Sequence, residues 1–231
     1  SYLLGVEAGL LTKANKVGSV LSLDIPLLSK YSGGFAEGAK SVNPAVETVA
    51  PQIIGGDNPF ADTARAKEQG LAFAATGAHQ GLAAGAAANP GTTAAAAGKG
   101  FFAATGVDQV FAVGAAANPG IMEAAAEKGF FAYGVDTNQC PLAPGFVVDG
   151  SIKSVNAVVE TVVGEIMDGK ASTDATSSFG LAEGGMTIVS LTDGAADSQC
   201  TVMDSPEVLD QVKQAFDDIV AGKIKVTDPL A

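Results

Sequence analysis

Residues 110–135 read VFAVGAAANPGIMEAAAEKGFFAYGV. Residues 110–113 form a short apolar run, which is typical of a strand that is buried on both faces. Residues 120–128 are predicted to be a helix, and residues 130–135 a second strand. Two strands separated by one helix are typical of a βαβ unit, in which the strands lie parallel in one sheet. The stretch therefore predicts an α/β fold with a parallel sheet flanked by helices.

The same alternation of strands and helices continues on both sides of this stretch. We expect further strands at residues 16–21, 46–54, 146–149 and 186–191. We expect further helices at residues 2–13, 26–40, 58–76, 152–166 and 205–222. Pro26, Pro59 and Pro206 each fall in the first turn of a predicted helix, where a missing N–H has no cost. In the helix at 26–40, Phe35 is expected to be a core residue.

Part of the chain is a tandem duplication. Residues 85–91 and 114–120 are both GAAANPG, and residues 99–103 and 128–132 are both KGFFA. We therefore interpret residues 78–106 as a duplicated strand–helix insert. Two copies are too few for a repeat architecture. The extra unit either adds a strand and a helix to the sheet or forms a surface excursion, and its origin (recent, engineered or an uncertain sequence assignment) stays open.

Charge and cysteine content exclude some classes of protein. The net charge of −12 argues against nucleic-acid binding, which depends on clustered Lys and Arg. Only Cys140 and Cys200 are present, and we expect two free thiols rather than one disulfide. No apolar run reaches the roughly 18 residues of a membrane span. Ser1 is not preceded by a signal peptide, so we interpret it as a processed end or as a cut through a longer protein.

The sequence contains no recognisable catalytic or cofactor motif. Neither a dinucleotide-binding G-x-G-x-x-G after a strand nor a P-loop is present. His79 is the only histidine, which leaves no histidine cluster for a metal and argues against a Ser-His-Asp or Cys-His relay. We expect no enzyme activity, no catalytic residues, no metal and no cofactor.

Several segments, in order along the chain, resemble one family of proteins. They are residues 2–13 (YLLGVEAGLLTK), 16–18 with 24–26 and 34–38 (KVG, DIP, GFAEG), 134–139 (GVDTNQ), 151–155 (SIKSV) and 179–185 (FGLAEGG). The set resembles the basic membrane protein (BMP) family, which includes purine nucleoside receptors of bacterial ABC importers. The resemblance implies a lobe of the type I periplasmic-binding-protein fold, in which two α/β lobes close on a ligand. Because the match begins at the hinge-crossing helix, residues 1–231 are expected to be the C-terminal lobe, with the N-terminal lobe missing.

The resemblance also implies a set of ligand-binding residues. Asp136 in the GVDTNQ loop would accept hydrogen bonds from ribose hydroxyls, and Lys153 would donate to the same sugar. Tyr31 falls where the family places an aromatic residue near the base. Gly114 and Asn118 lie in a loop that is glycine-rich in the family, although this chain has Ala115 and Ala116 there. Gly85 and Asn89 of the other repeat copy would compete for these last two roles.

The function implied by the resemblance is that of an extracytoplasmic solute-binding protein, a lipoprotein in its full-length form, which delivers nucleosides or related small molecules to an ABC importer permease. The alternative is a ligand-sensing or interaction protein of the same fold that takes no part in transport. A lone lobe would expose cleft surface, so we expect either a homodimer through that face or low stability.

Overall fold

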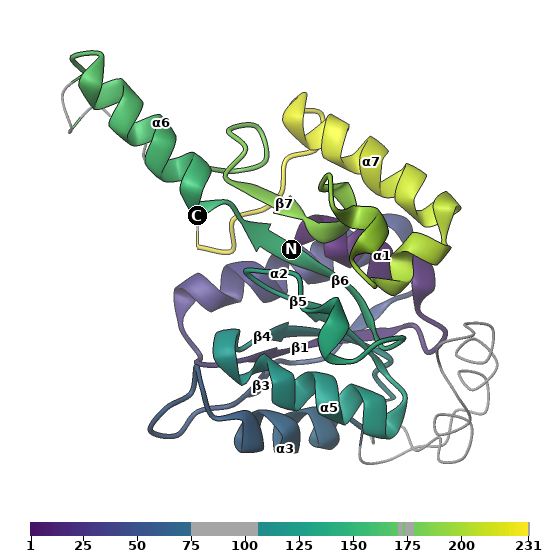
Figure 1. Ribbon diagram of the computed structural model, residues 1–231. Helices are drawn as coiled ribbons and strands as arrows, with labels where there is room; N and C mark the ends of the chain where they lie inside the picture. Colours follow the sequence, from purple (N-terminus) through teal and green to yellow (C-terminus); the bar gives the residue numbers. More distant parts are fainter. Residues whose placement is uncertain (75–105, 171–172, 174–177, 231) are drawn as a thin grey trace.

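The computed structural model describes residues 1–74, 106–170, 173 and 178–230 (Figure 1). Almost all of the predicted insert at 78–106 therefore lies outside the described residues. His79, Gly85 and Asn89 lie outside them as well.

A seven-stranded sheet forms the centre of the molecule. Its order is β2-β1-β4-β5-β6-β7, and β3 also pairs with β1. The strands are β1 (Lys16–Leu21), β2 (Glu47–Thr48), β3 (Gln52–Ile53), β4 (Gln109–Val113), β5 (Phe131–Gly134), β6 (Val147–Lys153) and β7 (Met186–Ile188). All pairs are parallel except β6–β7. The predicted α/β fold with a mainly parallel sheet is confirmed.

Helices cover both faces of the sheet (Figure 1). On one face lie α1 (Tyr2–Leu11), α2 (Pro26–Val42) and α7 (Pro206–Val220); on the other lie α3 (Thr63–Ala74) and α5 (Asn118–Lys128). The helices α1 and α2 approach closely because Gly5 and Gly38 have no side chains. A Cβ atom on either would collide with main-chain oxygen of the other helix. The sixth helix, α6 (Val155–Met167), projects away from the body and buries no residue.

The core consists of buried strands and aromatic side chains. Every residue of β4 is buried, as the apolar run at 110–113 predicts. Phe35 is buried as predicted and packs with ring centroids 5.1 Å from Phe111 and 5.4 Å from Tyr133. Burying one such large apolar side chain stabilises the fold by about 1.5–3 kcal/mol. These rings fix α2 over the middle of the sheet.

Some predicted elements differ from the structure. The expected strand at 46–54 is split into β2 and β3, because Pro51 has no N–H to donate to a sheet ladder. The expected helix at 58–76 begins only at Thr63, because Asp62 caps it by accepting a hydrogen bond from the Arg65 N–H at 3.0 Å. The segment before it, from Asn58, folds as a turn instead.

The antiparallel strand β7 departs from a purely parallel sheet. The chain leaves the carboxyl end of β6, passes through α6 and returns to the same edge, where the Ser154 N–H donates to Gly185 O at 2.9 Å. It therefore enters β7 running opposite to β6. The strand also stops at Ile188, and residues 189–191 of the predicted strand form a 3₁₀ turn.

The prediction of two free thiols is wrong. Cys140 and Cys200 form a disulfide, with Cα atoms 4.9 Å apart despite their separation of 60 residues in the chain. Sequence spacing did not reveal the pair, because the turns at residues 189–204 fold back beside the loop that follows β5. Among the described residues, no helix has both the length and the apolar character needed to cross a membrane.

Candidate functional site at the carboxyl edge of the sheet

Three of the predicted site residues lie at one edge of the sheet. Because β1, β4, β5 and β6 are parallel, their carboxyl ends meet at the same edge. Gly114 directly follows β4, Asp136 comes two residues after β5, and Lys153 is the last residue of β6. The carboxyl edge of a parallel sheet is where α/β folds usually place their ligands.

Asp136 and Lys153 form an ion pair at this edge. The Lys153 Nζ lies 2.9 Å from Asp136 Oδ1, and the Lys153 main-chain N–H donates to Asp136 O at 3.4 Å. The hydrogen bond to Asp136 raises the pKa of Lys153, so the lysine carries its charge at neutral pH. Their side chains remain 49% and 36% exposed, and the pair therefore offers an acceptor and a donor to solvent. That either residue binds a ligand stays a prediction.

Tyr31 lies near this pair but also belongs to an apolar cavity. Its charge interaction with Lys153 contributes to the raised pKa of that lysine. The Tyr31 ring lies 6.3 Å from the Phe111 ring and is half-buried. On its other side it lines a cavity of about 400 Å³ between α1, α2, β7 and α7, together with Leu181 and Ile219. Asp136 and Lys153 do not line this cavity, so the polar edge and the apolar cavity are separate features.

Asn118 lies beneath the edge and is fully buried. Its Nδ2 donates to Ala112 O at 2.9 Å and to Gln139 Oε1 at 2.8 Å, and its Oδ1 accepts the Gly114 N–H at 2.7 Å. Both amide hydrogens are therefore used inside the protein. The arrangement lets Asn118 hold the loops after β4 and β5, and it leaves no amide hydrogen for a ligand.

Gly114 is needed because the space around it is filled. A Cβ atom at residue 114 would lie 2.9 Å from both Asn118 Oδ1 and Ile54 Cδ1. The next residue, Ala115, has φ 51°, a left-handed conformation that glycine adopts far more readily than alanine. The loop thus keeps the backbone shape of a glycine-rich loop although alanine occupies the position.

The predicted site missed Gln139, which lies in the GVDTNQ segment. Its Oε1 accepts the Asn118 amide and also the Val135 N–H at 3.2 Å. The resemblance included Gln139 as part of the GVDTNQ segment but gave it no role. A sequence does not show that a glutamine side chain turns inward and joins the ends of two strands.

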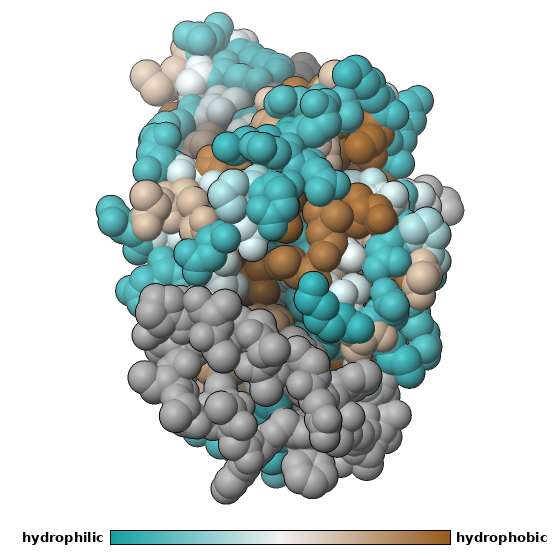
Figure 2. Space-filling model, turned by 90° about the vertical axis from the view of Figure 1, so that its right-hand side faces the viewer, coloured by the Kyte–Doolittle hydropathy of each residue, from teal (hydrophilic) through white to brown (hydrophobic). Residues whose placement is uncertain are grey.

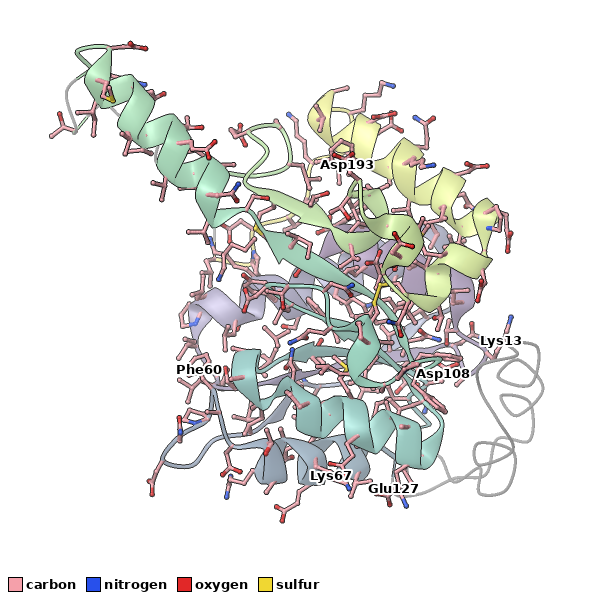
Figure 3. All side chains as sticks on the ribbon, in the orientation of Figure 1. Lys13, Phe60, Lys67, Asp108, Glu127 and Asp193 are labelled. Carbon is pink, nitrogen blue, oxygen red and sulfur yellow. A yellow bond between two sulfur atoms is a disulfide. The ribbon has the colours of Figure 1, made fainter. Side chains whose placement is uncertain are left out.

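The opposite edge, where the strands begin, is occupied by structural contacts. Asp108 accepts hydrogen bonds from Thr12 Oγ1 and from the Lys13 N–H, each at 2.6 Å, and so joins α1 to β4 (Figure 3). Burial is the main reason why its pKa is raised.

Figure 2 looks onto this side of the molecule, where apolar residues are surrounded by polar ones. In the described part of the chain, no group of three His, Cys, Asp or Glu residues could hold a metal ion.

The sheet order and the polar carboxyl edge are those of an α/β fold of the periplasmic-binding-protein type. The family model described as ABC transporter substrate-binding protein PnrA-like (Bmp) matches residues 1–102 and 88–223. The chain therefore belongs to this family of ABC transporter substrate-binding proteins.

Relatives of known sequence agree with this assignment. The ABC transporter nucleoside-binding protein BmpA of Lactococcus lactis is 27% identical over 226 residues, which are 98% of this chain and 57% of that protein. The CD4+ T-cell-stimulating antigen of Listeria monocytogenes is 50% identical over 44 residues, or 19% of this chain and 12% of that protein.

Solved structures support the fold. An ABC transporter solute-binding protein from Aeropyrum pernix aligns with a TM-score of 0.64 at 21% identity, covering all of this chain and 64% of that one. A transcriptional activator of the comK gene from Bacillus halodurans aligns with a TM-score of 0.61 at 19% identity, covering 95% and 61%. The chain thus spans less than two thirds of the length of these relatives.

Proposed function

We propose that this chain is the C-terminal ligand-binding lobe of an extracytoplasmic receptor that delivers a nucleoside, or a closely related small molecule, to an ABC importer permease. Family membership supports the receptor class, and the name of the Lactococcus relative supports the ligand class. The observation that carries the proposal is the Asp136–Lys153 pair, exposed at the carboxyl edge of the sheet.

The chemistry of this pair suits the sugar of a nucleoside. A carboxylate accepts hydrogen bonds, and two neighbouring ribose hydroxyls can donate to its two oxygens. The Lys153 ammonium has three hydrogens, of which one points to Asp136, and can donate to a ribose oxygen. The half-buried Tyr31 ring would add a flat aromatic face for the base of the same ligand.

The proposal is tested by titrating the chain with inosine and following the ligand by saturation-transfer NMR. Because the chain supplies one side of a site that closes between two lobes, we expect a Kd on the order of 1 mM, about −4 kcal/mol. Removing one charged hydrogen bond costs about 1.5–3 kcal/mol, so Asp136→Asn and Lys153→Met are expected to weaken binding at least about tenfold.

Lys223→Met is the matched control for these variants. Lys223 forms an ion pair of similar length with Asp218, at 2.8 Å, at the end of α7. Its loss is expected to leave the affinity for inosine unchanged. Equal affinity of the wild type and all variants for inosine, or no saturation transfer to inosine at all, would overturn the proposed site.

A further inference from the structure

The loop that carries Asp136 holds an uncommon backbone conformation. Asp136 has φ 69°, in the left-handed region that residues other than glycine seldom adopt. Such a conformation persists only where the surrounding structure holds it. The main-chain oxygen of Asp136 also accepts from the Lys153 N–H, so the path of this loop determines how the two side chains meet.

A first anchor holds the loop from the side of β4. Gln139 Oε1 accepts from the Val135 N–H and from Asn118, and Asn118 is itself bonded to the end of β4. The residues on both sides of Asp136 in the loop are thereby tied to the neighbouring strand.

A second anchor holds the loop from the side of residues 198–200. The Asn138 Nδ2 donates to Ser198 O at 3.0 Å, while its Oδ1 accepts the Cys140 N–H at 3.0 Å. The Cys140–Cys200 disulfide lies next to this bridge, with both cysteines buried. An alanine at residue 138 would remove both the donor to Ser198 and the acceptor for the Cys140 N–H.

We propose that Asn138 and the Cys140–Cys200 disulfide are positioning residues for the binding site, because they clamp the loop that aims Asp136 at the ligand. This inference rests on the proposed function, since it concerns the same sugar-binding carboxylate. Asn138 and the disulfide keep the Asp136 loop in its left-handed turn before a ligand arrives, which lowers the cost of binding.

The test compares two ligands that differ only at the sugar, inosine and 2′,3′-dideoxyinosine, with the wild-type chain and three variants. Asn138→Ala removes the bridge to Ser198, and the double variant Cys140→Ser/Cys200→Ser removes the disulfide. Asn43→Ala is the matched control, because Asn43 makes a similar bridge far from the site, donating to Gly9 O at 3.2 Å and accepting the Ala45 N–H.

The readout is the ratio of the two dissociation constants, at a temperature where circular dichroism shows every variant folded. We expect the wild type and Asn43→Ala to prefer inosine by about tenfold, and Asn138→Ala and the double variant to lose most of that preference. If these residues had a merely structural role, their loss would weaken the binding of both ligands equally and leave the ratio of dissociation constants unchanged.

The outcomes separate the two proposals. If the wild type prefers inosine and both clamp variants keep that preference, the clamp is overturned while the sugar site stands. If the wild type itself shows no preference for inosine, the proposed sugar site is overturned and the clamp with it. Should the double variant fail to fold, Asn138→Ala alone decides, because it keeps the disulfide.

Discussion

The helices α6 and α7 have similar lengths and both carry apolar residues at helical spacing, yet only α7 is packed. In α7 the residues Val208, Leu209, Val212 and Ala215 are buried against the body of the molecule. In α6 the side chains of Val155, Val159, Val163 and Ile166 remain 45–55% exposed. Periodicity therefore indicates that a helix has an apolar face, but it does not indicate whether that face is covered. Within the described residues, the face of α6 is uncovered.

The difference in packing between α6 and α7 is tested most directly by placing the same charge on both helices. Val212→Asp in α7 would bury an unpaired carboxylate and is expected to destabilise the fold by about 4 kcal/mol. Val159→Asp in α6 is expected to change the unfolding free energy by less than about 0.5 kcal/mol, because the side chain stays in water. Urea denaturation followed by circular dichroism measures both. Equal losses in the two variants would mean that α6 is packed after all.

A second, smaller difference is expected when a glycine is replaced by alanine in a packed helix and in α6. Gly38→Ala at the contact between α1 and α2 would force the main chains apart and is expected to cost about 1–3 kcal/mol. Gly164→Ala in α6 meets no atom within 4 Å and is expected to stabilise by about 0.5–1 kcal/mol, since alanine is the better helix former. The melting temperatures of the two variants should therefore move in opposite directions. A lower melting temperature for Gly164→Ala would contradict the open environment of α6.

A third expected difference concerns acids on α1 and α6 and depends on pH. Burial, followed by the charge of Asp149, raises the pKa of Glu7 well above its usual value of 4.5. The folded state then holds the proton more tightly than the unfolded chain does, so this acid favours folding at low pH. That contribution declines as pH rises above about 4.5, by at most about 1.4 kcal/mol per pH unit for one proton.

Glu7→Gln removes this proton and should lose less stability between acidic and neutral pH than the wild type does. Glu160→Gln, at an exposed position of α6, should follow the wild-type curve. Unfolding free energies from denaturant titrations at several pH values measure the difference. If the unfolding free energies of Glu7→Gln and the wild type decline in parallel as the pH rises, Glu7 is not the acid responsible.

Much of the architecture could be predicted because it depends on local patterns. The apolar run at 110–113 and the Pro-Gly start of the helix after it were enough to predict a βαβ unit. The strand at 16–21 has the predicted bounds. The convergence of Asp136 and Lys153 also follows, since residues at the ends of adjacent parallel strands must share an edge.

Contacts between distant segments could not be predicted in the same way. The disulfide joins residues 60 positions apart, and nothing near Cys140 in the sequence indicates that residues 189–204 return beside it. Asn118 was predicted as a ligand residue of the loop, whereas its side chain points inward and bonds to two strand ends. Whether an amide faces solvent or the interior depends on a rotation of the helix that its own sequence leaves open.

By itself, then, the sequence determined the α/β class, the family and the edge of the sheet where the polar residues gather. These follow from hydrophobic periodicity and chain direction, which are properties of consecutive residues. Only the tertiary structure decided that Cys140 pairs with Cys200, that the Asn118 side chain points inward and that the apolar face of α6 is uncovered. Each of these depends on which surfaces meet in space, and that is set by the packing of the whole chain rather than by any one segment.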